Sequence, residues 1–419
     1  MLTRVPSLAP LALASLAAAQ PLTTLVGGAD QGGTTAIQRQ VVCRPASVLC
    51  SPVLGLPTQR FAGGTAVDPI RQVVWDTDGL RMVSVLSTVN GGACRIVCGP
   101  MPVPGLPAGA VATGLAFEED GTSAGALWVV DSALGLQRLT WPTRSCPGPG
   151  QRCNIAPFMP TPNHVPGGLA ISEVHGAVFF SASDFSGGAP NNWVFGVRLG
   201  NPCQPFCRLQ VGDCGAVRLG PITGLAFDDC TSTMYLTDGR ITMVATYTPP
   251  SSTMPCQLQV VSCCTQQVGR WYGLCVEPVH ATNVGRACTA APCPNCAGSM
   301  SLNALGDASL GNAAFGYRLS GAPPGVLAFC FVNIGGCTPG IPLLCGTFHV
   351  PLAPPPVNLG AVATVGAACA ANADHLLPIP LSPWLCGIQL SAQDVILCPG
   401  TTGFGVGLSN AVCTTISDT

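Results

Sequence analysis

The chain has 419 residues, of which only 9% are charged and 47% are hydrophobic, with 51 glycines, 40 prolines and 24 cysteines. This composition excludes a disordered polar chain, and the frequent glycines and prolines exclude long helices. All 17 basic residues are arginines and they form no cluster. This argues against nucleic acid as a partner and excludes lysine chemistry such as a Schiff base.

The N-terminal residues 1–19 are predicted to be a cleaved signal peptide. Arg4 precedes an apolar run that ends in Ala17-Ala18-Ala19, so we expect cleavage before Gln20. A transmembrane anchor is disfavoured because the run is short and no stop-transfer flank follows it. No later apolar run is long enough to span a membrane. We therefore expect a secreted protein, extracellular or at the cell surface, whose cysteines form disulfides.

Five segments share a motif of glycine, small or apolar residues and an acid. The motifs begin at Gly64, Gly114, Gly168, Gly224 and Gly273, which are 50, 54, 56 and 49 residues apart. In four of them a second apolar strand, an acid, a third strand and a cysteine pair follow. An all-β repeat with a period of about 40–60 residues is typical of a β-propeller. Glycine and alanine suit its innermost strands, where backbones approach closely.

The N-terminal segment is expected to close the ring. It lacks the glycine motif but carries the pair Cys43 and Cys50, whereas little follows Gly273. If this segment completes the last blade, residues 20–285 form five blades and no open sheet edge remains. Six blades are an alternative if residues 20–62 hold further strands.

One repeat resembles a known family. Gly224-Leu-Ala-Phe-Asp228 followed by Met234-Tyr-Leu-Thr-Asp238-Gly-Arg-Ile241 is similar to the NHL-type propeller repeat, and the resemblance covers residues 36 to about 285. It implies a propeller fold. It leaves the function open, because such propellers range from ligand scaffolds to lactonases.

Residues 286–298 form a cysteine-rich linker that carries Cys288, Cys293 and Cys296. These thiols could bind zinc, but a fourth ligand is missing nearby and a secreted chain favours disulfides. In residues 299–419, six to eight short alternating strands separated by Gly/Pro turns predict a β-sandwich.

The C-terminal segment also resembles a module that recurs in bacterial secreted proteins. The resemblance rests on Leu310-Gly-Asn, Leu377-Pro-Ile-Pro380 and Gly407-Leu-Ser-Asn410. It implies a role in display, sorting or attachment rather than chemistry.

Several polar and aromatic residues are expected on the propeller face where the innermost strands begin. The candidates for a ligand-binding face are Arg60, Asp78, Asp131, His164, Asp184, Trp193, Asp238, Arg270 and Trp271. The four acids could line a metal site, but the Asp-Gly pairs at 78–79 and 238–239 favour capping of their own turns. We nominate no catalytic residue, metal ligand or cofactor, because no spacing indicates a nucleophile with its base.

Thirteen cysteines are singled out as disulfide candidates. They are Cys43, Cys50, Cys94, Cys98, Cys146, Cys153, Cys207, Cys214, Cys256, Cys263, Cys288, Cys293 and Cys296. Cys43–Cys50 and Cys146–Cys153 could each close a hairpin, whereas Cys207–Cys214 and Cys256–Cys263 span strand-like sequence and are harder to bridge. If the propeller pairs internally, the linker shares at least one bridge with the sandwich or free thiols remain.

These features favour a monomeric, non-catalytic binding or scaffold protein with an unknown extracellular ligand or envelope component as partner. Two alternatives stay open: a metal-dependent lactone or ester hydrolase of the gluconolactonase type, and a structural component of the cell envelope. The hydrolase is disfavoured because the innermost strands offer glycine, alanine, leucine and cysteine where a metal needs polar ligands.

Overall fold

The computed structural model describes residues 23–31, 34–51, 63–69, 71–87, 93–119, 125–141, 146–215, 217–252, 254–265, 270–277, 281–343, 345–400 and 403–417. The expected all-β character is confirmed: the helical segments described are two short 3-10 turns, η1 (Ala156–Phe158) and η2 (Pro383–Leu385). The predicted signal peptide and Arg60 lie outside the described residues. In the part of the chain that is described, no helix has the length and hydrophobicity needed to cross a bilayer.

Four antiparallel sheets follow one another along the chain, each with its strands in sequence order. Sheet 1 contains β4 (Gly64–Asp68), β5 (Val73–Thr77), β6 (Arg81–Leu86) and β7 (Ile96–Pro102). Sheet 2 contains β8 (Ala112–Glu118), β9 (Ala126–Asp131), β10 (Gly135–Thr140) and β11 (Gly148–Asn154). Sheet 3 contains β12 (His164–Ser172), β13 (Ala177–Asp184), β14 (Asn191–Arg198) and β15 (Asn201–Gln210). Sheet 4 contains β16 (Gly224–Asp228), β17 (Thr233–Thr237), β18 (Ile241–Thr248) and β19 (Gln257–Thr265).

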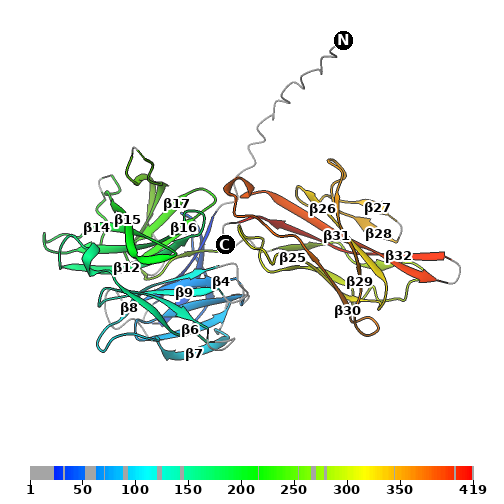
Figure 1. The fold of residues 1–419 in the computed structure, drawn as a ribbon, viewed down its shortest axis with the longest axis horizontal. Coiled ribbons are helices and arrows are strands. Elements are labelled where there is room, and N and C mark those ends of the chain that lie inside the picture. The colour runs from blue at the N-terminus through cyan, green and yellow to red at the C-terminus, as the bar shows by residue number, and fades with distance from the viewer. Residues whose placement is uncertain are drawn as a thin grey trace, which may run out of the picture.

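Sheet 5 joins the two ends of this region. The short strands β20 (Arg270–Trp271) and β21 (Cys275–Val276) both pair with β1 (Thr24–Gln31), which continues into β2 (Thr34–Val41) and β3 (Ser47–Cys50). The expectation that the N-terminal segment completes the last sheet is therefore confirmed. The antiparallel sheets of this region form a β-propeller, which Figure 1 shows in blue to green.

The repeated glycines are explained by the contacts between neighbouring innermost strands. A Cβ atom on Gly168 of β12 would lie 2.3 Å from the backbone nitrogen of Leu225 in β16. A Cβ atom on Gly114 of β8 would lie 2.6 Å from the carbonyl oxygen of Gly167. Because real Cβ atoms do not approach backbone this closely, only glycine fits where the sheets converge on the axis.

Six disulfides connect neighbouring sheets along the outer strands, and together they close a ring. The hairpin pairings Cys43–Cys50 and Cys146–Cys153 expected from the sequence are wrong, because in each pair one cysteine faces the preceding sheet and the other the following sheet. We call the six bridges the disulfide belt: Cys50–Cys94, Cys98–Cys146, Cys153–Cys203, Cys207–Cys256, Cys214–Cys263 and Cys43–Cys264.

The C-terminal part contains a six-stranded and a three-stranded sheet that share one core. The larger sheet contains β22 (Thr282–Val284), β23 (Cys288–Thr289), β32 (Gly403–Thr415), β31 (Gln389–Gly400), β26 (Leu327–Ile334) and β29 (Val357–Ala363). The smaller sheet contains β24 (Ser301–Leu305), β25 (Gly316–Ala322) and β30 (Ala371–Leu376), and β27 (Ile341–Leu343) pairs with β28 (Gly346–Phe348). Leu302 and Tyr317 pack between the sheets against Ala328 and Ile396.

Residues 282–289 belong to this larger sheet through β22 and β23, although the sequence analysis assigns them to the propeller end and the linker. All three linker cysteines are bridged to the C-terminal part, in Cys288–Cys345, Cys293–Cys398 and Cys296–Cys369. Cys337–Cys413 adds a fourth bridge there. The propeller does not pair internally as assumed, because Cys230–Cys386 connects it to the C-terminal part.

Candidate functional site

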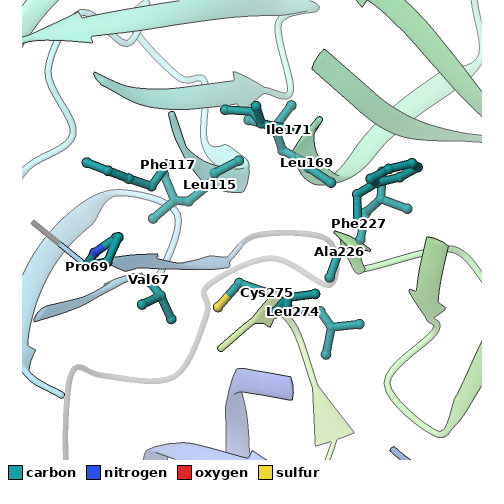
Figure 2. Close-up of a pocket in the computed structure, with 14 residues that line it drawn as sticks. Val67, Pro69, Leu115, Phe117, Leu169, Ile171, Ala226, Phe227, Leu274 and Cys275 are labelled. Atoms are coloured by element: carbon teal, nitrogen blue, oxygen red, sulfur yellow. The ribbon is translucent and has the colours of Figure 1, made fainter. Parts of the chain in front are cut away.

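An apolar pocket of about 50 Å³ lies on the propeller axis, where the innermost strands end. Val67, Leu115, Leu169 and Ala226 come from four different sheets and surround it together with Leu274, which lies between β20 and β21, as Figure 2 shows. A few water molecules would fill this volume.

Cys275 is the one thiol among the residues that line this pocket, and it occupies the motif position where the other four strands carry alanine. Its Sγ atom donates a hydrogen bond to the carbonyl oxygen of Val26, at 3.3 Å. Burial raises the pKa of this thiol, so it stays protonated and is a poor nucleophile at neutral pH.

The acids that end the innermost strands are bound within their own sheets or to the N-terminal strands. Asp68 pairs with Arg71 at 2.7 Å, and Glu118 accepts hydrogen bonds from the Trp128 indole at 2.7 Å and from Arg138 at 2.8 Å. Asp228 caps the amide of Thr231 at 3.2 Å, and Glu277 pairs with Arg39 of β2. These contacts stabilise turns and the closing sheet.

Three further acids occupy the next position in the chain, where sheet 1 has Pro69, a residue that lines the pocket. We call Glu119, Glu173 and Asp229 the rim acids. Asp229 accepts the backbone amide of Glu173 at 2.8 Å and the hydroxyl of Ser172, and Glu173 in turn accepts the backbone amide of Glu119. Asp229 and Glu173 thus each cap the equivalent turn of the preceding sheet.

The rim acids all have raised pKa values, mainly because burial disfavours their charged form. The pKa of Glu119 is raised to about 7, that of Glu173 to about 9, and that of Asp229 to about 6. For Glu173, the neighbouring Glu119 carboxylate raises the pKa further. These residues are not among the site candidates expected from the sequence, although the doubled acids at 118–119 and 228–229 mark two of them.

The same rim contacts the C-terminal part. The hydroxyl of Ser309 donates a hydrogen bond of 2.7 Å to Glu119. Cys230, next to Asp229, forms the disulfide with Cys386, and Val174, next to Glu173, packs on the C-terminal core. The turns of sheets 2, 3 and 4 therefore form the interface.

The four acids of the expected ligand face cap their own turns. Asp78 accepts the amides of Leu80 and Arg81, Asp131 those of Ala133 and Gly135, Asp184 that of Ser186, and Asp238 those of Arg240 and Ile241. Asp78 and Asp131 also pair with Arg81 and Arg152. These contacts match the turn-capping interpretation of the sequence.

The other residues of that face have different surroundings. His164 lies opposite Asp184 in the β12–β13 ladder, and Thr161 joins the two side chains by hydrogen bonds of 3.0 Å. Trp193 is covered by the guanidinium of Arg208 at 4.2 Å. Trp271 is buried in the core, whereas its neighbour Arg270 is exposed. Among the described residues, no group of three or more His, Cys, Asp or Glu is arranged to hold a metal ion.

A cluster of four buried polar side chains lies inside the C-terminal core. Cys330 of β26 lies opposite Asp394 of β31, and Tyr317 of β25 lies opposite His375 of β30. His375 Nε2 is 3.4 Å from Asp394 Oδ2, and all four residues are buried. Burial and the adjacent Asp394 raise the pKa of the Cys330 thiol, so it too is expected to be unreactive.

No protein-family model matches the chain, and no curated protein matches its sequence. Solved structures with a similar arrangement include a luciferin-regenerating enzyme (10% identity, TM-score 0.32, covering 84% of this chain and 91% of that one). Another is the WD40 domain of SCAP from fission yeast (10% identity, TM-score 0.29, covering 93% of this chain and 96% of that one). A third is a periplasmic gluconolactonase of Pseudomonas aeruginosa (10% identity, TM-score 0.30, covering 95% of this chain and 97% of that one). Similarity at this level carries no argument about activity.

Proposed function

We propose that this protein is a secreted, non-catalytic binding scaffold, built from a five-bladed propeller of the NHL type and a C-terminal β-sandwich. The five sheets around one pocket support the blade count, and the two sheets with a shared core support the sandwich. In this proposal the sandwich attaches or displays the propeller at or outside the cell surface.

The observation that carries the proposal is the disulfide belt. Each of the five junctions between neighbouring sheets is bridged at least once, and a further bridge connects the propeller to the C-terminal part. Disulfides persist in oxidising compartments, and they stabilise the fold by reducing the conformational entropy of the unfolded chain. A covalently closed ring of this kind suits a rigid surface that presents loops to a partner outside the cell.

The proposal can be tested on the chain expressed with its own N-terminal residues in the cells that produce it. We expect the protein in the medium or on the cell surface, and saturable binding of the purified protein to isolated cell envelopes. The same protein after reduction and alkylation serves as the control and should not bind. Recovery from the cytoplasm, or envelope binding equal to that of the control, would contradict the proposal.

Enzymatic assays separate the hydrolase alternative from the scaffold. The purified protein is incubated with a panel of sugar and aryl lactones in the presence of calcium or zinc, and its metal content is measured. We expect no turnover above the buffer rate. Metal-dependent hydrolysis would replace the scaffold with the lactonase. Recovery only in the detergent-insoluble envelope pellet would favour the structural component.

A further inference from the structure

The rim acids form a directional series around the pocket. The carboxylate of sheet 4 caps the turn of sheet 3 through the amide of Glu173, at 2.8 Å, and the carboxylate of sheet 3 caps the turn of sheet 2 through the amide of Glu119. In sheets 3 and 4, one acid of the repeat therefore binds the backbone of the sheet before it.

The series stops at sheet 1 for a chemical reason. The equivalent residue there is Pro69, which has no backbone N–H to donate. The carboxylate of Glu119 instead accepts the Ser309 hydroxyl of the C-terminal part, at 2.7 Å. The rim acids of sheets 3 and 4 thus bind the preceding sheet, whereas the rim acid of sheet 2 binds the C-terminal part of the chain.

The charged groups that face these carboxylates are mainly acids. Asp68 and Asp307 face Glu119, Glu118 and Asp229 face Glu173, and Asp228 faces Asp229. The nearby bases have other contacts: Arg71 pairs with Asp68 and Arg138 with Glu118. The ring of His175 packs against Phe227 and Tyr247, and burial lowers its pKa, which disfavours its charged form. Neighbouring acids disfavour one another's charged form, which favours protonation.

We propose that the contact between the propeller and the C-terminal part is a protonation-sensitive latch, closed while Glu119 and Glu173 carry protons and weakened when they lose them. The Cys230–Cys386 disulfide keeps the two parts connected after the contact opens, so opening is reversible. The inference concerns a contact within the chain and holds whether or not the scaffold function does.

The direction of the pH dependence follows from the raised pKa values. In the closed contact the pKa of Glu119 is about 7 and that of Glu173 about 9, against an ordinary value of 4.5. Between pH 4.5 and these values the closed form binds more protons than the open form. The contact is therefore strongest in acid, and it weakens steadily as the pH rises toward about 9.

Opening of the latch would change access to the axial pocket. Phe117, Ile171 and Phe227 line the pocket and lie within two residues of the rim acids in the chain. Three of the five strands that surround the pocket therefore lead directly into the interface with the C-terminal part.

Hydrogen–deuterium exchange of the intact, disulfide-bonded chain at pH 5 and pH 9 tests the latch. After correction for intrinsic exchange rates, we expect the amides of Glu119 and Glu173 and the segment around Ser309 to exchange at least about tenfold faster at pH 9, since one pKa unit corresponds to a factor of ten. Equal corrected rates at the two pH values would overturn the proposal.

The double variant Glu119→Gln/Glu173→Gln separates the latch from a general effect of pH. Its carboxamides still accept hydrogen bonds but carry no charge, so its exchange should be slow at both pH values. Glu277→Gln is the control, because this acid ends an innermost strand but pairs with Arg39 of β2 and not with the C-terminal part, and it should keep the response of the unaltered chain. A double variant that keeps the full response would refute the role of these acids. Ser309→Ala is expected to exchange faster already at pH 5, which gives a second readout if the double variant does not fold.

Discussion

The glycine that begins each repeat motif is determined by the neighbouring backbone. The side of Gly168 that would carry a Cβ atom faces β16, with Leu225 N at 2.3 Å from the ideal Cβ position. The strand cannot move aside easily, because the disulfide belt holds sheets 3 and 4 together through Cys207–Cys256 and Cys214–Cys263. Overpacking at this position must therefore strain the backbone.

Gly168→Ala is accordingly expected to lower the free energy of unfolding by about 1–3 kcal/mol, as overpacked core positions do. Gly200→Ala is the control, because no atom lies within 4 Å of its Cβ position, and it should change stability by less than about 0.5 kcal/mol. Urea unfolding followed by circular dichroism measures both. An equal effect of the two substitutions would contradict the close approach at the axis.

At the scale of the elements, disulfides connect the outer strands of neighbouring sheets. Cys153 of β11 and Cys203 of β15 are 50 residues apart in the chain, but their Cα atoms are 5.5 Å apart. Among the described residues, this single bridge connects sheets 2 and 3. Sheets 3 and 4 share two bridges, each between cysteines that are 49 residues apart in the chain.

Because one junction has a single bridge and the other has two, removing a bridge should lower the free energy of unfolding by different amounts. Cys153→Ser/Cys203→Ser should lower the free energy of unfolding by about 2–4 kcal/mol, because it releases a long loop in the unfolded chain. Cys214→Ser/Cys263→Ser should lower it by at most about half as much, because Cys207–Cys256 still closes nearly the same loop. Guanidinium unfolding of both paired variants checks this order. The reverse order would show that native packing at the bridges matters more than loop closure.

For the molecule as a whole, the disulfides can be counted chemically. Eleven bridges use 22 of the 24 cysteines, and Cys275 and Cys330 remain as thiols. Burial raises the pKa of both, and a protonated thiol reacts poorly with alkylating reagents.

Mass spectrometry after iodoacetamide treatment should therefore find no modified cysteine in the native protein at pH 7. It should find two in denaturant without reductant, and 24 after reduction. More than two in denaturant alone would show that at least one bridge is not formed. Peptide mapping should assign the two modified thiols to Cys275 and Cys330.

The sequence allowed the strands and their repetition to be predicted, because both depend on short-range pattern. Gly-Leu-Ala-Phe at a period near 50 residues, an acid after the second strand and abundant turn residues indicate small antiparallel sheets. The turn-capping role of Asp78 and Asp238 was likewise readable from the adjacent glycine. The apolar character of the axis also follows from the residues of the motif.

The tertiary structure alone decided which distant residues meet. Cys43 and Cys264 are 221 residues apart in the chain and have Cα atoms 5.4 Å apart, a proximity that ring closure creates and local spacing cannot reveal. The contact of Glu119 with Ser309 spans 190 residues and depends on how the two parts dock. The repeat pattern determines where strands form, because it is local in the chain. Which cysteines bridge one another depends on the distances between packed sheets. For that reason the propeller was visible in the sequence, and the disulfide belt and the latch were not.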